Sequence, residues 1–378
     1  MTAIKYTQSA ASQEVPPPYH FPGVIVHAFV WEASMQRVQA YCDKYFNLGT
    51  AEERGFVYRP VPIWPYAVLL ILEYPEMVSS SPERVVIDGK LAPYSDRGII
   101  SQTEAFVAFP VVRYGTRRAS RLLNTNLEFA LPFITVENAM SAVCGREMLG
   151  MGKLLGLIET GEGVYPGSFS GSIDLPGWPM SGPGVMERNM RFLTVETGPG
   201  LPTFRGSPET SSRWTLFQSR EAGWALDETA SLADFVEDVT AGSSPTVMRT
   251  TSLKQIRDAR CPEKAVYQAL VSSRAHYDNV REFCFYNEND VCITFKDVGS
   301  FKEVLDEFLD PPSTAGADRQ VKAKAAFKFI ADIDFDETHT IHTFPNDGDP
   351  HLAPASASRA LVSPWLRPLW GLFGPRPS

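Results

Sequence analysis

Between residues 57 and 112, short apolar runs of β-type residues alternate with proline and glycine turns and predict β-strands. The clearest runs of this kind, bounded by proline and glycine turns, span residues 67–74 and 104–113. Further strands are predicted at 124–136 and 190–195.

Two segments instead carry apolar residues at helical spacing. Residues 34–46 are predicted to form the first helix, and residues 301–309 a second, amphipathic helix. Residues 252–269 mix helical and strand signals, while 284–295 are predicted to form a pair of strands around a turn. The sequence therefore predicts an α+β chain in which strands predominate.

Composition narrows the class of protein. The 378 residues are 44% hydrophobic and 21% charged, which is ordinary for a globular protein. A formal net charge of −9 disfavours a nucleic-acid-binding protein, which needs a basic surface to replace counterions. The five cysteines form no CxxC pair, the N-terminus lacks the features of a signal peptide, and no apolar run reaches the roughly 20 residues of a membrane span. We therefore expect a cytoplasmic protein without a transmembrane segment.

One segment carries the most specific chemical signal. Residues 145–156 read GREMLGMGKLLG and hold a single lysine, Lys153, among apolar neighbours that include Met151 and Leu155. Burial of a lysine penalises its charged form and so favours the neutral amine, which can form Schiff bases with aldehydes and ketones. In most such segments the apolar neighbours belong to the core and the lysine amine reaches water. This segment alone therefore does not decide whether Lys153 is a nucleophile or an ordinary lysine whose amine reaches water.

The order of residues around Lys153 resembles the active-site segment of the acetoacetate decarboxylase family. Gly-Arg-Glu precedes the lysine by five residues, and residues 136–143, VENAMSAV, are similar to the family's lead into that motif. Upstream, Thr103-Glu104-Ala105 is similar to the family's Thr-Glu-Ser strand, and residues 329–333 resemble its closing strand. The resemblance implies that Lys153 is the Schiff-base residue and that the Glu104 carboxylate lies beside it.

The resemblance also has departures. Family decarboxylases carry a second lysine directly after the nucleophile, where this chain has Leu154, and an arginine early in the chain, at a position we align with Val24. Ile71 aligns with another pocket glutamate of the family, and Glu73 is predicted to point to the same face of its strand as Ile71. These differences argue against acetoacetate itself as the substrate.

The predicted site has Lys153 and Glu104 as catalytic residues, with Glu73, Arg146 and Met151 as substrate-binding candidates. Arg146 and Glu147 are expected to form an ion pair that shapes the loop, and Gly150 and Gly152 to allow a close backbone approach. The predicted reaction is decarboxylation of a β-keto acid or related carbonyl acid through an iminium on the lysine. Aldol, dehydratase or cyclase chemistry through the same iminium is the alternative, and a non-catalytic binding protein is a third.

The fold implied by the resemblance is mainly antiparallel β, a curved sheet closing towards a barrel with peripheral helices. It would occupy residues 19–343, with a probable insertion at 161–207, after a mobile segment at 1–18 and before a Pro- and Trp-rich tail at 344–378. The insertion would be a lid, an interface piece or a variable surface loop. The resemblance implies a homo-oligomer that acts on a small carbonyl compound without a cofactor.

Other chemical motifs fit poorly. The lysine segment fails the spacing of a phosphate-binding loop, because Glu147 and Leu154 stand where glycine and Ser or Thr are needed. The acidic stretch at 332–337 breaks the calcium-loop pattern at its sixth position, Glu337. No metal site is therefore predicted.

Overall fold

The computed structural model describes most of the chain between residues 15 and 344. The described residues are 15–61, 64–79, 86–87, 89–91, 99–116, 126–180, 182–199, 246–312, 314, 316–336 and 338–344. The apolar tail from residue 345 onward and the first 14 residues, both singled out in the sequence, lie outside them.

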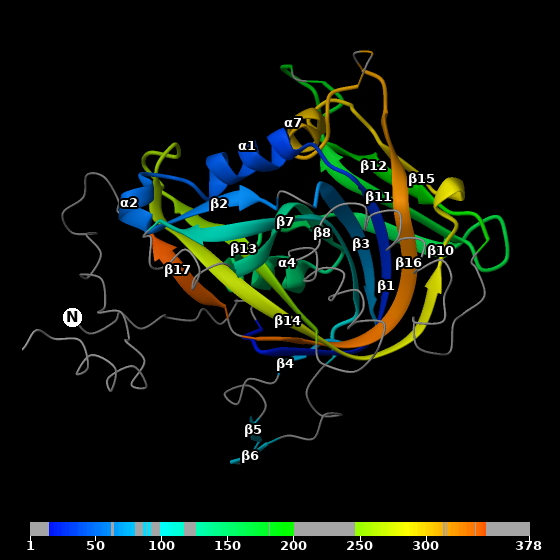
Figure 1. The fold of residues 1–378 in the computed structure, drawn as a ribbon, viewed down its shortest axis with the longest axis horizontal. Helices are drawn as coiled ribbons and strands as arrows, with labels where there is room; N and C mark the ends of the chain where they lie inside the picture. The colour runs from blue at the N-terminus through cyan, green and yellow to red at the C-terminus, as the bar shows by residue number, and fades with distance from the viewer. Residues whose placement is uncertain are drawn as a thin grey trace, which may run out of the picture.

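The described residues form a mainly antiparallel β fold around a closed ring of strands (Figure 1). The ring strands are β1 (Tyr19–Glu32), β3 (Tyr66–Tyr74), β7 (Gln102–Gly115), β8 (Asn126–Val136), β13 (Thr246–Arg257), β14 (Ala265–Phe285) and β16 (Arg319–Phe335). They pair in the order β16-β1-β3-β7-β8-β13-β14, and β14 pairs again with β16 to close the ring. Within the ring only the β8–β13 pairing is parallel, so the predicted fold class is confirmed.

The remaining strands extend or flank the ring. β15 (Cys292–Phe295) pairs with β16 and continues the sheet outward through β12 (Arg188–Glu196), β11 (Phe169–Gly177) and β10 (Leu157–Glu162). The short strands β2 (Phe56–Pro60), β4 (Val78–Ser79), β9 (Leu154–Leu155) and β17 (His339–Thr343) pair with β7, β1, β8 and β14 respectively. A small separate hairpin joins β5 (Val86–Ile87) to β6 (Lys90–Leu91).

Helices are few and short. The described helices are α1 (Met35–Tyr45), α2 (Ala51–Arg54), α4 (Ala139–Glu147), α7 (Phe301–Asp306) and the 3-10 turn η3 (Glu288–Asp290). α1 and α7 lie outside the ring, whereas α4 lies within its outline in Figure 1. Every described helix falls short of the length and apolarity that a membrane-spanning helix requires.

Alternating side chains of the ring strands build two separate cores. On β3, Leu70 and Leu72 belong to one buried cluster, and Leu69 and Ile71 belong to the other. The first cluster receives side chains from every ring strand and from the segment after α4, so it is the inner core of the ring. The second cluster packs the outer face of the ring against α1, α7 and the sheet of β11, β12 and β15.

Most of the predicted elements are present with small shifts at their ends. The predicted helices at 34–46 and 301–309 correspond to α1 and α7, and the strands predicted at 67–74, 104–113 and 124–136 correspond to β3, β7 and β8. The strand predicted at 190–195 lies within β12, in the described part of the predicted insertion, where β11 and β12 pair with each other.

The predicted pairing within residues 284–295 is wrong. β14 ends at Phe285 and pairs with β13, β16 and β17, whereas β15 pairs with β12 and β16. Asn279 and Glu282 both adopt a φ of 54°, where the register between β14 and β16 shifts. These irregularities bend β14 from one ring neighbour towards the next, and a local turn signal does not reveal such a bend.

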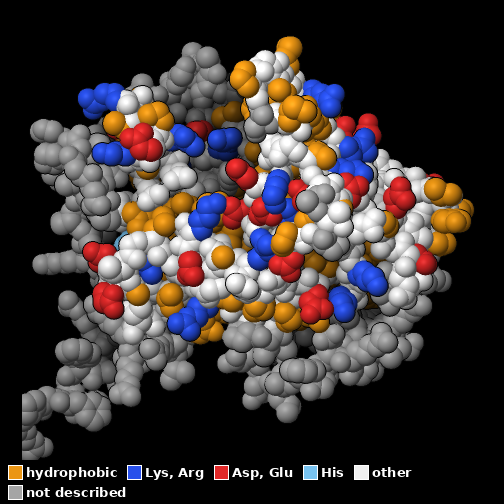
Figure 2. Space-filling view, turned by 90° about the horizontal axis from the view of Figure 1, so that it is seen from above, with side chains coloured by type: hydrophobic (Ala, Val, Ile, Leu, Met, Phe, Trp, Pro, Cys, Tyr) orange, Lys and Arg blue, Asp and Glu red, His pale blue; other side chains and the backbone are white. Residues whose placement is uncertain are grey.

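The surface seen from above carries basic and acidic side chains side by side, with hydrophobic side chains gathered on its projecting parts (Figure 2). The most exposed large hydrophobic side chains of the described residues are Val164, Met186 and Met180, at 90%, 82% and 64% exposure. They lie in the connections between β10, β11 and β12. Exposed apolar side chains thus concentrate at strand connections.

Candidate active site

Lys153 lies inside the ring and forms an ion pair with Glu104. Its side chain is buried, and its Nζ donates to Glu104 Oε2. The Lys153 Nζ also lies 3.4 Å from Ser141 Oγ, which is buried too. The apolar surroundings predicted for the lysine are therefore present, but its amine has a carboxylate partner. Such a pair can move a proton between nitrogen and oxygen without water.

Glu104 points inward because of its register in the ring. It lies opposite Leu72 on β3 and Val136 on β8, and directly opposite residues of paired strands share a face. Leu72 and Val136 are buried, so Glu104 is the charged member of an apolar row. Tyr74, two residues along β3 from Leu72, donates its hydroxyl hydrogen to Glu104 Oε1 at 3.5 Å.

Ser141 reaches Lys153 because α4 is anchored at its start. The Asn138 side chain accepts hydrogen bonds from the backbone N–H groups of Met140 and Ser141, which caps the helix. Ser141 and Gly145 are four residues apart and so lie on the same face of the helix. That face contacts the lysine side chain.

Gly145 provides the space that the lysine occupies. A Cβ atom at this position would lie 2.4 Å from Lys153 Cδ and 2.6 Å from Cε, well inside van der Waals contact. The glycine of the Gly-Arg-Glu motif is therefore required for the packing of the lysine that follows eight residues later.

The two glycines before the lysine differ. Gly150 adopts a φ of +68°, and a Cβ there would lie 2.7 Å from Val271 Cγ2. Position 150 therefore needs glycine both for its positive φ and because a side chain would overlap Val271. A Cβ on Gly152 would meet nothing within 4 Å, so the predicted close approach at Gly152 is wrong.

Two tyrosines line the same inner core as Glu104. Burial raises the pKa of Tyr74 and of Tyr277, and the nearby Glu104 charge raises both further. Both hydroxyls therefore keep their protons at neutral pH and can donate hydrogen bonds. Ser141, Tyr74 and Tyr277 were not predicted from the sequence as site residues. Only Ser141 carried a signal, its spacing of one helical turn from Gly145.

The other predicted site residues lie at different places. Met151 is buried in the inner core with Tyr74 and Tyr277. Arg146 is exposed, and its guanidinium lies 3.5 Å from the backbone carbonyl of Lys153. Arg146 and Glu147 both lie in the described part of the chain and do not form the predicted ion pair there. The Glu147 carbonyl instead accepts a hydrogen bond from Lys254.

Glu73 lies on the opposite face of the ring wall from Glu104. It shares the face of Ile71, as the alternation predicts, but that face belongs to the outer core. Glu73 Oε1 lies 3.5 Å from His27 Nε2, and His27 Nδ1 lies 3.0 Å from the Tyr286 hydroxyl. The structure therefore does not bring Glu73 together with Lys153.

The acidic stretch considered for a metal is engaged in pairs across strands. Asp334 pairs with His20, and Asp336 pairs with His276. Asp332 accepts hydrogen bonds from the Gly23 backbone. Within the described residues, no three His, Cys, Asp or Glu side chains are grouped to hold a metal ion.

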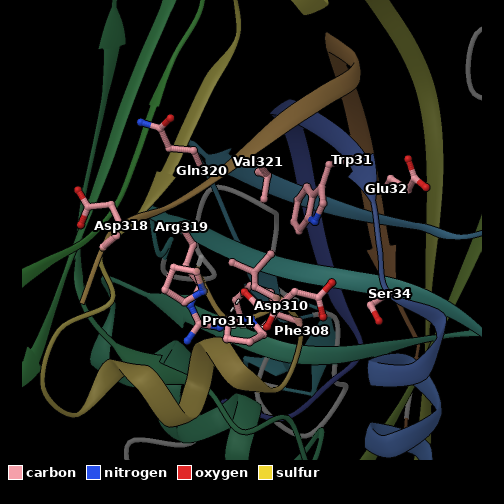
Figure 3. A pocket seen from close by; sticks show the side chains of 13 residues that line it. Trp31, Glu32, Ser34, Phe308, Asp310, Pro311, Asp318, Arg319, Gln320 and Val321 are labelled. Carbon is pink, nitrogen blue, oxygen red and sulfur yellow. Dashed lines mark hydrogen bonds between the residues drawn. The ribbon is translucent and has the colours of Figure 1, made fainter. Parts of the chain in front are cut away.

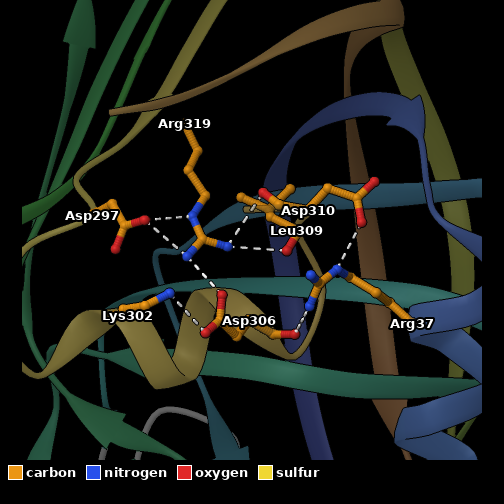
Figure 4. A network of polar contacts seen from close by, with 7 residues as sticks. All are labelled: Arg37, Asp297, Lys302, Asp306, Leu309, Asp310 and Arg319. Atoms are coloured by element: carbon orange, nitrogen blue, oxygen red, sulfur yellow. Dashed lines mark hydrogen bonds and ion pairs between the residues drawn. The ribbon is translucent and has the colours of Figure 1, made fainter. Parts of the chain in front are cut away.

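A separate pocket of about 370 Å³ lies outside the ring, near the start of β16 (Figure 3). Trp31 lines it together with Asp310 and Arg319. Arg319 is buried and donates to Asp297 and Asp306, and also to the carbonyls of Leu309 and Asp310 (Figure 4). Its donors are occupied within the protein, so this arginine ties the structure together.

No family model matches this sequence, and no curated protein matches it. Solved structures with a similar fold include an acetoacetate decarboxylase from Legionella pneumophila subsp. pneumophila str. Philadelphia 1, with 10% identity and a TM-score of 0.47, covering 91% of this chain and 93% of that chain. An acetoacetate decarboxylase-like enzyme from Sphingomonas wittichii RW1 has 11% identity and a TM-score of 0.45, with 88% and 96% covered.

A third similar structure is the enduracididine biosynthesis enzyme MppR, complexed with the condensation product of pyruvate and imidazole 4-carboxaldehyde. It has 13% identity and a TM-score of 0.47, and the match covers 88% of this chain and 92% of that chain. Two of these three structures are an acetoacetate decarboxylase and an acetoacetate decarboxylase-like enzyme, which is the family that the lysine segment resembles. At these identities the likeness is one of fold and does not extend to substrate or reaction.

Proposed function

We propose that this chain is a Schiff-base lyase that acts on a small carbonyl compound, with Lys153 as the nucleophile and Glu104 as the proton-transfer group. The observation that carries the proposal is the buried Lys153–Glu104 pair inside the ring, with the lysine side chain packed on Gly145. A buried amine beside a group that can take its proton is the arrangement that nucleophilic catalysis by lysine needs.

The first steps follow from the contact between the two groups. Glu104 takes a proton from the Lys153 ammonium, and the neutral amine attacks the carbonyl carbon of the substrate. The protonated Glu104 then gives its proton to the departing hydroxyl, which leaves as water. The product is an iminium on Lys153 beside a Glu104 carboxylate, so the charges at the end equal those at the start.

The iminium accepts an electron pair from a bond that breaks next to it. For a β-keto acid, which the sequence resemblance implies, the bond to the carboxylate breaks and gives CO₂ and an enamine. Protonation of the enamine and addition of water then release the ketone and restore Lys153. Ser141 Oγ, 3.4 Å from the Lys153 Nζ, is placed to hydrogen-bond the nitrogen during these steps.

A second candidate is aldol, dehydratase or cyclase chemistry through the same iminium. It is favoured by the surroundings of Val24 and Leu154, the two positions where this chain lacks a basic residue that the family carries. Val24 is fully buried in the inner core, and Leu154 is 37% exposed on β9. Neither position supplies a cation for a substrate carboxylate.

The experiment is borohydride reduction of the full chain with a panel of β-keto acids, α-keto acids and uncharged ketones, followed by peptide mass spectrometry. We expect a reduced adduct on Lys153 that is absent in Lys153→Ala. Release of CO₂ separates decarboxylation from aldol-type reactions. A folded protein that forms no adduct with any of these carbonyl compounds would contradict the proposal and leave a binding protein on this fold.

We further propose a cytoplasmic homo-oligomer. The five cysteines all lie in the described residues as thiols rather than disulfides, which fits a reducing compartment. The exposed Trp178, Met180 and Met186, in the connection between β11 and β12, are of the type that subunit contacts bury. Light scattering coupled to size-exclusion chromatography measures the mass of the particle, and a monomer at all concentrations would contradict this proposal.

A further inference from the structure

The inner face of the ring supplies the Glu104 carboxylate, hydroxyl groups and the buried amide of Gln102 among apolar side chains. Around Glu104, the buried residues of the inner core include Val26, Leu72, Phe106, Met248 and Phe329. Tyr74 and Ser141 supply polar hydrogens at the Glu104–Lys153 pair. Among the buried charged side chains of the described residues, Lys153 and Glu104 pair with each other, while Glu128 pairs with Arg113 and Asp297 pairs with Arg319.

Two basic side chains at the end of α4 are engaged by backbone carbonyls. Arg146 is exposed and contacts the backbone carbonyl of Lys153, and Lys254 donates to the carbonyl of Glu147 at the end of α4. Both therefore bind backbone carbonyls outside the buried pair. Within the described residues, the positive charge of Lys153 therefore balances the negative charge of Glu104 in the site.

That balance constrains what can bind. Condensation replaces the Lys153 ammonium by an iminium of equal charge, so an uncharged substrate keeps the pair neutral throughout. A substrate carboxylate would add a second anion beside Glu104, in surroundings where an unpaired charge is costly. The hydroxyls of Tyr74 and Ser141 can instead donate to a neutral carbonyl or hydroxyl oxygen.

We infer that the compound that condenses with Lys153 is an uncharged aldehyde or ketone with an apolar body, rather than a keto-acid anion. This inference rests on the proposed Schiff-base function. With no carboxylate to lose, the iminium acidifies the hydrogen on the adjacent carbon. Glu104 takes that proton, the C–H electron pair forms the enamine double bond, and the positive charge on nitrogen is neutralised. The enamine carbon can then add to a second carbonyl group, which is the aldol branch of the proposed function.

The test compares acetoacetate with methyl acetoacetate, which has the same reacting ketone but no charge. The full chain is reduced with cyanoborohydride at pH 7 over a range of each compound, and the Lys153 adduct is quantified by peptide mass spectrometry. The result is expressed as the ratio of the concentrations of the two compounds that half-label Lys153. The same ratio, measured for a free lysine derivative, corrects for the different intrinsic reactivity of the two ketones. We expect half-labelling of Lys153 at a concentration of methyl acetoacetate at least about tenfold lower, which corresponds to about 1.4 kcal/mol.

Two variants make the cause specific. Glu104→Gln removes the buried anion and is expected to shift the corrected ratio towards acetoacetate. Glu137→Gln makes the same change at an exposed carboxylate that contacts the neighbouring Thr103 backbone, and is expected to leave the ratio unchanged. The wild-type ratio alone decides the inference if Glu104→Gln does not fold.

The outcomes separate the two levels of the proposal. Equal or better labelling by acetoacetate would overturn the inference while supporting the Schiff-base function. Labelling by neither compound, in a protein that circular dichroism shows to be folded, would overturn both. Preferential labelling by methyl acetoacetate that persists unchanged in folded Glu104→Gln would also overturn it, because charge balance would then not be the cause.

Discussion

A single added carbon atom at Gly145 would prevent the Lys153 side chain from occupying its position in this site. The Lys153 side chain runs over Gly145 so closely that even a methyl group there would overlap its Cδ and Cε. Its amine then meets Glu104, which alternation on β7 directs into the ring. The position of Lys153 thus depends on the absence of a side chain at Gly145 and on which face of β7 carries Glu104.

Gly145→Ala is expected to displace the lysine and to slow borohydride trapping on Lys153 by about tenfold or more, because overpacking a buried contact costs roughly 1–3 kcal/mol. Gly152→Ala is the matched control, since a Cβ there meets nothing within 4 Å. Trapping rates and thermal unfolding are measured for both variants. A Gly145→Ala protein that traps carbonyl compounds as fast as the wild type would show that the contact is not needed.

The pH dependence of stability should report on His27. Burial lowers the pKa of His27 from 6.5, and the Glu73 carboxylate partly opposes this shift. The folded protein therefore binds this proton more weakly than the unfolded chain does. The stability that neutral His27 contributes is complete above pH 6.5 and is lost as the pH falls from there towards the folded pKa.

We expect the free energy of unfolding, measured by urea denaturation between pH 7.5 and pH 5, to decrease less steeply in His27→Gln than in the wild type. One proton accounts for at most about 1.4 kcal/mol per pH unit of this slope. The comparison of slopes removes the constant cost of losing the stacking between His27 and Phe169. Identical slopes would mean that His27 does not titrate differently in the two states.

Secondary-structure elements assemble the site by their registers and ends. β3 presents Leu72 and Tyr74 to the inner core and Glu73 to the outer face, where the carboxylate meets His27. α4 begins at an Asn138 cap and so presents Ser141 to the lysine. Of these residues only Glu73 was a site candidate from the sequence, and the face that each one occupies follows from strand pairing and from the helix cap.

Loss of the α4 cap should affect both stability and the site. Asn138→Ala is expected to lower the free energy of unfolding by about 1 kcal/mol, because two backbone N–H groups lose their acceptor. It should also slow trapping on Lys153, since Ser141 lies in the first turn. Asn138→Asp retains an acceptor and is expected to restore most of both. Unchanged urea denaturation of Asn138→Ala would contradict this role for the cap.

At the scale of the whole molecule, the ring and the outer sheet are joined by a buried charge network. Arg319, at the start of β16, is bound by Asp297 before α7 and by Asp306 within it (Figure 4). Arg37 of α1 reaches the same region through Asp310. This network holds both helices against the outer core, while the inner core encloses the lysine.

Arg319→Ala is expected to lower the free energy of unfolding by about 3–5 kcal/mol, because it leaves the buried Asp297 carboxylate without its partner. Arg37→Ala removes an ion pair to an exposed carboxylate, Asp310, and is expected to cost about 1 kcal/mol or less. Urea denaturation of both variants measures the difference. Equal losses in the two variants would contradict the distinction between buried and exposed pairs.

The sequence by itself predicted the strand-rich class, several elements, and the two residues at the centre of the proposed site. Apolar runs of β-type residues marked β3 and β7, and bulky apolar residues marked β8, because such composition between proline and glycine turns is typical of buried strands. The resemblance of the segments around Lys153 and Glu104 to the acetoacetate decarboxylase family predicted that these two residues lie side by side, and their side chains are in contact.

Only the tertiary structure decided which faces meet. The closure of the ring by β14 and β16 depends on long-range pairing and on bends at Asn279 and Glu282 that no local pattern encodes. The same closure put Glu73 outside and Tyr74 and Tyr277 inside. Contacts between residues far apart in sequence arise when strands pair, and a one-residue change of register would exchange the two faces.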